Sequence, residues 1–86
     1  MASKKIAQNG PSLGSVQIGE SVQIRRLAGG HQFLSRLASL GFTPGAHLKV
    51  LQNYGHGPII VGLRDTRVAL GRGEAEKILV EKVTEA

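Results

Sequence analysis

"RLASLGFTPG", residues 36–45, decides how the chain folds, because it ends a helix and turns the chain in one short stretch. Its first half continues an apolar stripe with helical spacing. Gly41 stands where a glycine in the left-handed conformation closes a helix. Pro44 and Gly45 suit the central positions of a type II turn, since Pro fixes φ and Gly tolerates a positive φ. We interpret these glycines and the proline as architectural, with the apolar Phe42 between them.

The residues before this stretch predict the body of the helix. Apolar side chains recur there at i, i+1, i+4 and i+7 and form one stripe: Phe33, Leu34, Leu37 and Leu40. Gly29 and Gly30 provide the entry, without the Ser, Thr, Asp or Asn that usually caps a helix. Arg36 points away from the stripe, where an arginine either stays solvated or contacts a carboxylate or phosphate of a partner.

Segments in which apolar and polar residues alternate predict strands on both sides of the helix. The expected strands are residues 21–27, 46–53, 58–64, 67–71 and 78–83, with a short extended piece at 12–20 in front of them. Arg26 falls on the inward side of the alternation, so the first strand should bend or end there. We place a glycine-rich loop at 54–57, a tight turn at Asp65-Thr66 and one helical turn near 72–78.

The composition fits one small domain with an aliphatic core. The chain has 86 residues, of which 41% are hydrophobic, with two Phe, one Tyr and no Trp. Several short strands and one helix in this space indicate a small β-barrel. We therefore predict a mainly β fold with one main helix, formed by residues 12–86 behind a flexible N-terminal tail at 1–11. The helical stripe and Phe42 would cover one end of this barrel.

The sequence carries little that indicates catalysis or metal binding. It has no cysteine, which excludes disulfides and thiolate ligands, and no apolar run of the length that spans a membrane. His31, His47 and His56 fall on separate expected elements, so we assign no metal ligand. "GRGEAEK" has glycines before a short helix but not the spacing or the Lys-Ser/Thr end of a phosphate loop. We predict no catalytic residue, no cofactor and no insertion into the membrane.

Residues 19–81 together resemble the FeoA family. The matching features are the Gly-Gly pair before the helix, "RLASLGFTPG", the strand after it, "PIIVGLRDTRVAL" and "AEKILVE", in the family's order and spacing. Leu13 matches an apolar position in front of them, whereas Asp65-Thr66 departs from the family, in which a glycine is common in that turn. The resemblance implies an SH3-like β-barrel with one main helix. It also implies a small cytoplasmic accessory protein of bacterial ferrous-iron uptake.

The resemblance further implies a partner, namely FeoB, a membrane permease with a cytosolic GTP-binding domain. We therefore expect a non-enzymatic module that docks on the cytosolic part of this permease, at the inner face of the membrane. Exposed apolar residues mark such interfaces. Leu51 and Ile60 fall on the outward faces of their strands, and Leu79 lies in the last strand. The docking candidates are therefore Leu51, Ile60 and Leu79, together with Arg36 and Arg64.

Nucleic-acid binding is the alternative function, because small barrels of the KOW and Tudor kinds also have basic faces. The chain has a net charge of +5 and a sequence pI near 10.3. A stripe of cations on the outer face of the sheet would contact phosphates, and its candidates are Arg25, Lys49, Arg64 and Arg67. Tyr54 is the residue available for base stacking, or else an apolar lid on the barrel. The scarcity of aromatic residues argues against stable nucleic-acid binding.

Overall fold

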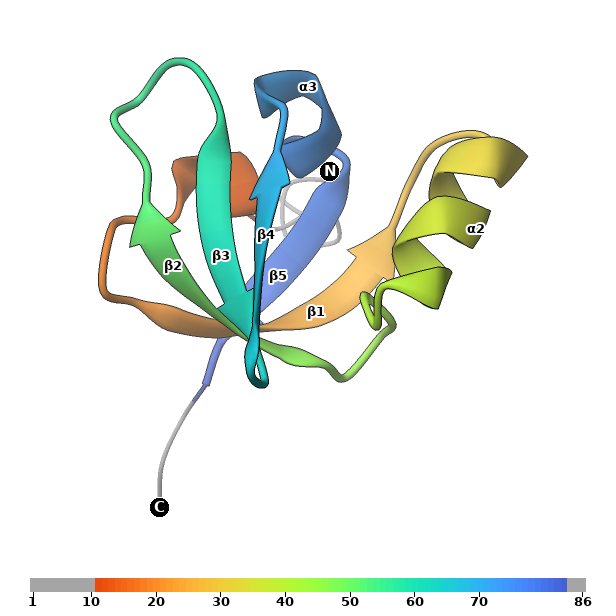
Figure 1. The fold of residues 1–86 in the computed structure, drawn as a ribbon, viewed down its shortest axis with the longest axis horizontal. Helices are drawn as coiled ribbons and strands as arrows, with labels where there is room; N and C mark the ends of the chain where they lie inside the picture. The colour runs from red at the N-terminus through yellow and green to blue at the C-terminus, as the bar shows by residue number, and fades with distance from the viewer. Residues whose placement is uncertain (1–10, 84–86) are drawn as a thin grey trace, which may run out of the picture.

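The computed structural model describes residues 11–83, which form a strongly bent sheet with one main helix at its side (Figure 1). The elements in chain order are the 3-10 helix η1 (Leu13–Ser15), β1 (Ser21–Leu27), α2 (His31–Ser39), β2 (His47–Gln52), β3 (Ile59–Leu63), β4 (Thr66–Leu70), the short α3 (Arg72–Ala75) and β5 (Ile78–Lys82). The flexible tail expected at residues 1–11 lies outside the described residues except for Pro11. The carbonyl of Pro11 accepts a hydrogen bond from the Val80 N–H (2.9 Å).

The strands form one antiparallel sheet in the order β4-β3-β2-β1-β5. The alternation in the sequence explains this arrangement, because buried residues alternate with exposed ones along β2 and with half-buried ones along β3, and the buried set faces the inside of the bend. This is the small SH3-like β-barrel with one main helix that the family resemblance implies. Each strand from β1 to β4 thereby presents one face to the core and one face outward.

The core is aliphatic apart from one aromatic ring. Phe42 is fully buried, and among residues 11–83 no polar or charged residue is buried with it. The other fully buried large side chains come from every strand and from η1 and α2: Leu13, Val22, Ile24, Leu37, Leu48, Val50, Ile59, Val61, Leu70, Ile78 and Val80. Burying a side chain of this size contributes about 1.5–3 kcal/mol. Because its side chain is fully buried among these residues, Phe42 belongs to the core.

The end of α2 is closed by a Schellman motif centred on Gly41. Gly41 has a φ of 98°, and its N–H donates to the Ala38 carbonyl (3.0 Å). The Phe42 N–H reaches back to the Leu37 carbonyl (2.9 Å), and both of these side chains are fully buried. This pattern satisfies the last carbonyls of the helix and adds the apolar contact that usually accompanies it. The helix therefore ends where the sequence predicts.

The turn that follows fixes the start of β2 against β1. Gly45 has a φ of 92°, and the Ala46 N–H donates to the Thr43 carbonyl (2.9 Å), which is the pattern of a turn with Pro44 and Gly45 at its centre. The Gly45 N–H also donates to the Ile24 carbonyl (2.7 Å). The turn is thus hydrogen-bonded to the sheet, and it directs the chain from α2 into β2.

Three expectations about local structure need correction. The piece at 12–20, expected to be extended, contains the 3-10 helix η1 at Leu13–Ser15, and Ser12 makes a single bridge to Leu79 of β5. The tight turn lies one residue earlier than expected, because Leu63 pairs with Thr66 and leaves Arg64 and Asp65 at its tip. The helical stripe covers the core only in part, since Leu40 is 41% exposed.

The expected irregularity at Arg26 is present. The register between β1 and β5 shifts between Ile24 and Arg26, and Arg26 is exposed. A bulge there carries the arginine to the outside, because a charged side chain on the core face would be buried without a partner.

Candidate docking surface

The sequence-based docking candidates lie in separate parts of the fold. Leu51 of β2 and Ile60 of β3 share the outer face of neighbouring strands, and Leu51 is 37% exposed whereas Ile60 is half-buried. Arg64 is exposed in the turn between β3 and β4, at the far end of this face. The structure therefore brings Leu51 and Ile60 together and leaves the remaining candidates elsewhere.

Arg36 and Leu79 both make contacts within the fold. Arg36 on α2 forms an ion pair with Glu74 of α3. Leu79 is half-buried in β5, opposite Arg26 of β1 and bridged to Ser12. Arg36 thus ties α2 to α3, and Leu79 lies two strands away from Leu51. Neither residue extends the face around Leu51.

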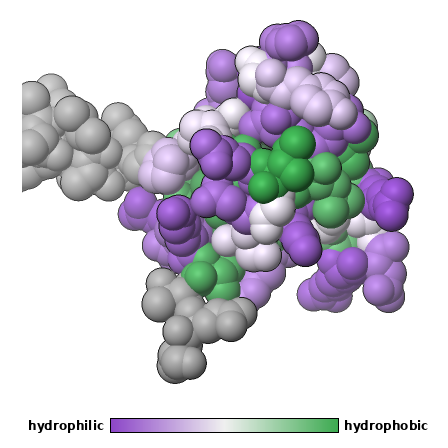
Figure 2. Space-filling view, turned by 90° about the vertical axis from the view of Figure 1, so that its left-hand side faces the viewer, coloured by the Kyte–Doolittle hydropathy of each residue, from purple (hydrophilic) through white to green (hydrophobic). Residues whose placement is uncertain are grey.

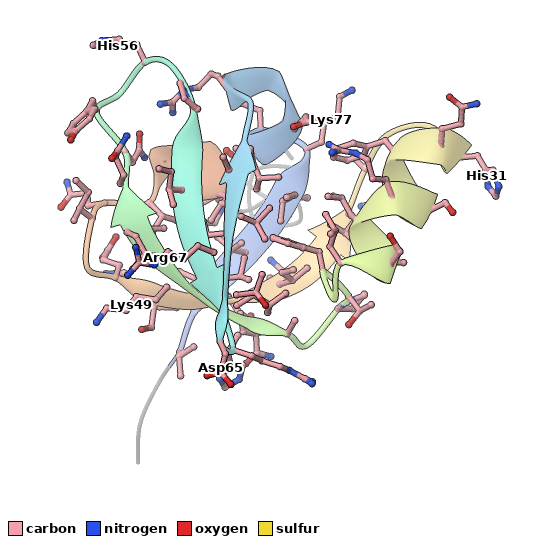
Figure 3. All side chains as sticks on the ribbon, in the orientation of Figure 1. His31, Lys49, His56, Asp65, Arg67 and Lys77 are labelled. Atoms are coloured by element: carbon pink, nitrogen blue, oxygen red, sulfur yellow. The ribbon has the colours of Figure 1, made fainter. Side chains whose placement is uncertain are left out.

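A glycine on the outer face leaves space that the Leu51 side chain occupies. Gly62 of β3 lies between Lys49 of β2 and Arg67 of β4 in the register of the sheet. A Cβ atom added to Gly62 would stand 3.4 Å from Cδ1 of Leu51, so the leucine side chain lies over the glycine. Neighbouring strands are about 4.8 Å apart, which separates the Cα atoms of the two flanking cations by about 10 Å. Lys49 and Arg67 both lie on the side of the molecule where β2 runs (Figure 3).

Two further exposed apolar residues lie on segments next to Leu51. Ile18 is 51% exposed and Tyr54 is 66% exposed. The segment with Ile18 runs along β2, because the Gly19 N–H donates to the Val50 carbonyl (2.8 Å) and the Val50 N–H donates to the Glu20 carbonyl (3.0 Å). Figure 2, which shows the side where β2 lies, has a small group of apolar residues surrounded by hydrophilic ones.

We call this surface the β2 patch and define it by its exposed or half-exposed side chains: Ile18, Lys49, Leu51, Tyr54, Ile60 and Arg67. Tyr54 does not act as an apolar lid, since most of its side chain is exposed. Sequence reasoning missed Ile18 as a surface residue. Its loop has no periodicity, so the sequence carries no signal for the direction of that side chain.

A hydrogen-bond network holds the rim of the β2 patch in place. The Asn53 side-chain amide donates to the carbonyls of Val16 (2.7 Å) and Gly14 (3.2 Å). Its oxygen accepts from the Gly55 N–H (3.0 Å) and from Nη2 of Arg72 (2.8 Å). Arg72 also donates from Nη1 to the Gly14 carbonyl (2.9 Å). This network connects η1, the loop after β2 and α3, and it leaves a hollow of about 490 Å³ beside Ile18.

The titratable residues of the described chain are scattered with respect to metal binding. Among residues 11–83 there is no group of three or more His, Cys, Asp or Glu side chains that could hold a metal ion. His31 at the start of α2 and His56 in the loop after β2 lie at opposite ends of the molecule (Figure 3). Within the same range, no helix has the length and apolar character that crossing a membrane requires.

This barrel is similar to solved structures of FeoA proteins and to one part of a manganese-dependent transcriptional repressor. A crystal structure of an "Iron Uptake Regulatory Protein (FeoA)" superposes with a TM-score of 0.78 at 35% identity and covers 84% of this chain and 96% of its own. The NMR structure of a FeoA-like protein from Clostridium acetobutylicum gives a TM-score of 0.76 at 25% identity, covering 91% of this chain and 92% of its own. A manganese-dependent transcriptional repressor gives 0.79 at 26% identity, with 85% of this chain matching 36% of the repressor.

The sequence comparisons identify the family. The model described as "FeoA domain" matches residues 12–82. A curated protein of Methanocaldococcus jannaschii named "Putative Fe(2+) transport protein A" is 40% identical over 63 residues, which are 73% of this chain and 76% of that protein. The chain therefore belongs to the FeoA family, which is associated with Fe(2+) transport.

Proposed function

We propose that this chain is a non-enzymatic accessory module of ferrous-iron uptake that acts in the cytoplasm by docking on the cytosolic part of a FeoB-type GTP-binding permease. Family membership supports the link to Fe(2+) transport. The observation that supports docking is the β2 patch, where Leu51, Ile18 and Tyr54 are exposed on segments that are hydrogen-bonded to each other. Exposed apolar side chains that gather on one face are typical of interaction sites.

Contacts within the fold hold several parts of the β2 patch in position, which suits a docking surface. Leu51 lies against Gly62 on a paired strand, and the Asn53 network fixes the loops on either side. A pre-organised surface loses little conformational entropy on binding. An interface built on it would place the apolar residues at its centre and the two cations at its rim, which is the usual anatomy of a protein interface.

An NMR titration tests this proposal. Isotope-labelled chain is titrated with the GTP-binding domain of the cognate permease and, separately, with the full-length permease in nanodiscs. We expect the largest shifts at Leu51, Ile60 and Tyr54, with the amides of α2 unchanged. Shifts that follow added duplex DNA or RNA and centre on Lys49 and Arg67, without a response to either form of the permease, would instead support the nucleic-acid alternative.

A further inference from the structure

The cations on the two sides of the sheet differ in how many of them form ion pairs, although Arg26 of β1 is exposed and in none of the ion pairs within residues 11–83. On β1 and β5, Arg25 pairs with Glu81 (3.7 Å) and Lys82 pairs with Glu20 (3.6 Å). On the outer faces of β2 and β4 and in the turn between β3 and β4, no ion pair within residues 11–83 involves the cations Lys49, Arg67 or Arg64. The acid nearest in sequence is Asp65, which is exposed at the hairpin tip. Lys49, Arg64 and Arg67 therefore form a group of cations without an ion pair on the side of β2, β3 and β4.

The arrangement of this charge is specific. Lys49 and Arg67 stand on either side of Gly62, and the Leu51 side chain occupies the space above the glycine. The face thus presents a cation, an apolar side chain and a second cation in a row across the sheet. Its complement is a surface in which an apolar side chain lies between two carboxylates.

We propose that the β2 patch receives an acidic segment of the permease, in which an apolar residue contacts Leu51 and the flanking carboxylates pair with Lys49 and Arg67. This inference rests on the proposed function and adds the chemistry of the partner. An arginine presents a fork of N–H donors that matches a carboxylate, and the lysine adds a point charge on a flexible stem. Such charge pairs at the rim of an interface steer association and select the partner.

The two other anionic surfaces in a cell fit this row less well. Attachment to an anionic bilayer usually takes a cluster of about four to eight Lys or Arg residues, and here two cations enclose an apolar residue. Nucleic-acid binding gains its affinity from many phosphate contacts and from exposed aromatic residues. Tyr54 is the one exposed aromatic side chain among residues 11–83. An acidic protein segment is therefore the occupant that the patch favours.

Charge reversal in the full-length chain tests the inference. Lys49→Glu and Arg67→Glu each change the net charge as much as the control Arg26→Glu, whose side chain is exposed on β1 beyond the patch. Affinity for the full-length permease in nanodiscs is measured by microscale thermophoresis at low and high NaCl. We expect about a tenfold weakening for each patch variant and little change for the control. Salt should weaken the wild-type complex and affect the Lys49→Glu complex much less.

The outcomes separate the inference from the function on which it rests. If the wild-type chain binds the permease and both patch variants bind equally well, docking stands and the acidic partner is wrong. If the wild-type chain fails to bind the permease in either salt, the proposed function itself is wrong. Vesicles with phosphatidylserine and a single-stranded oligonucleotide serve as parallel probes. Binding to either that exceeds binding to the permease and is lost in Lys49→Glu would overturn the choice of a protein partner.

Discussion

At the scale of single residues, two positions carry unusual backbone geometry for different reasons. Gly41 has a φ of 98°, and a Cβ there would stand 3.0 Å from Cδ2 of Leu63, so conformation and space both require glycine. Arg64 has a φ of 58° and is the one non-glycine residue with positive φ among residues 11–83. It takes this conformation because the pairing of Leu63 with Thr66 leaves a two-residue hairpin turn.

Gly41→Ala should destabilise the domain by about 1–2 kcal/mol, since it forces an L-residue into the left-handed region and against Leu63. Gly73→Ala in α3 is the matched control, because a Cβ there meets nothing within 4 Å and its φ is ordinary. The control should be neutral or stabilising, as alanine is the better helix former. Urea unfolding followed by circular dichroism measures both. Equal stabilities of the two variants would contradict this account of the helix end.

Arg64→Gly should stabilise the domain by about 0.5 kcal/mol. Glycine removes the strain of a positive φ, which for other residues costs about 1–2 kcal/mol, and part of this gain is offset by the greater freedom of glycine in the unfolded chain. Asp65 does not have a positive φ, so Asp65→Gly removes no strain and should be destabilising instead. Thermal unfolding of the two variants provides the comparison, and a lower melting temperature for Arg64→Gly would contradict the expectation.

At the scale of elements, the sequence predicts the regular parts of the fold and misses the contacts between them. The strands and α2 are predictable because their periodicity and the turn residues Gly41, Pro44 and Gly45 are local signals. The hairpin turn lies one residue earlier than predicted, because nothing in the sequence shows that Arg64 accepts a positive φ. The ion pair between Arg36 and Glu74 and the position of Lys77 over the Phe33 ring (5.3 Å) join segments far apart in the chain. Local patterns carry no information about such contacts.

Asn53→Ala should cost about 2–3 kcal/mol, although Asn53 lies in a loop. The substitution removes the side-chain donor to the Val16 carbonyl and the acceptor for Nη2 of Arg72, while Arg72 and the Gly14 carbonyl keep their bond to each other; leaving such part-buried groups unsatisfied costs about 1–3 kcal/mol. Asn53→Asp keeps the acceptor for Arg72 but sets a carboxylate oxygen against the carbonyls of Gly14 and Val16, so it should be destabilising as well. Amide hydrogen exchange checks the location of the effect, which should appear at η1 and α3 before β2. Uniform loss of protection would show that the network does not hold these elements specifically.

At the scale of the whole molecule, the domain has a buried apolar core and an exposed surface, the β2 patch, that carries both apolar and charged side chains. The sequence located two members of that surface, Leu51 and Ile60, because alternation places them outward. It also placed Lys49 and Arg67 in one stripe. It could not show that Gly62 lies between those cations, since that relation depends on the register of three strands. The docking function itself remains a proposal.

Leu51→Asp should leave the fold intact and abolish docking, because this side chain lies on the β2 patch. Leu48→Asp is the contrasting variant: Leu48 is 2% exposed, and a buried carboxylate without a partner should unfold the domain. Circular dichroism reports the fold, and thermophoresis with the permease reports docking. Unfolding of Leu51→Asp would place Leu51 in the core and remove it from the interface.

The ends of the described chain have a consequence for how this domain can be joined to others. Pro11 is hydrogen-bonded to Val80 of β5, and the Val83 N–H reaches the Ser21 carbonyl at 3.4 Å, so both ends leave next to β5. β5 is the edge of the sheet opposite β4. Segments joined to the two ends of the described residues would therefore start from the same side of the barrel, next to β5.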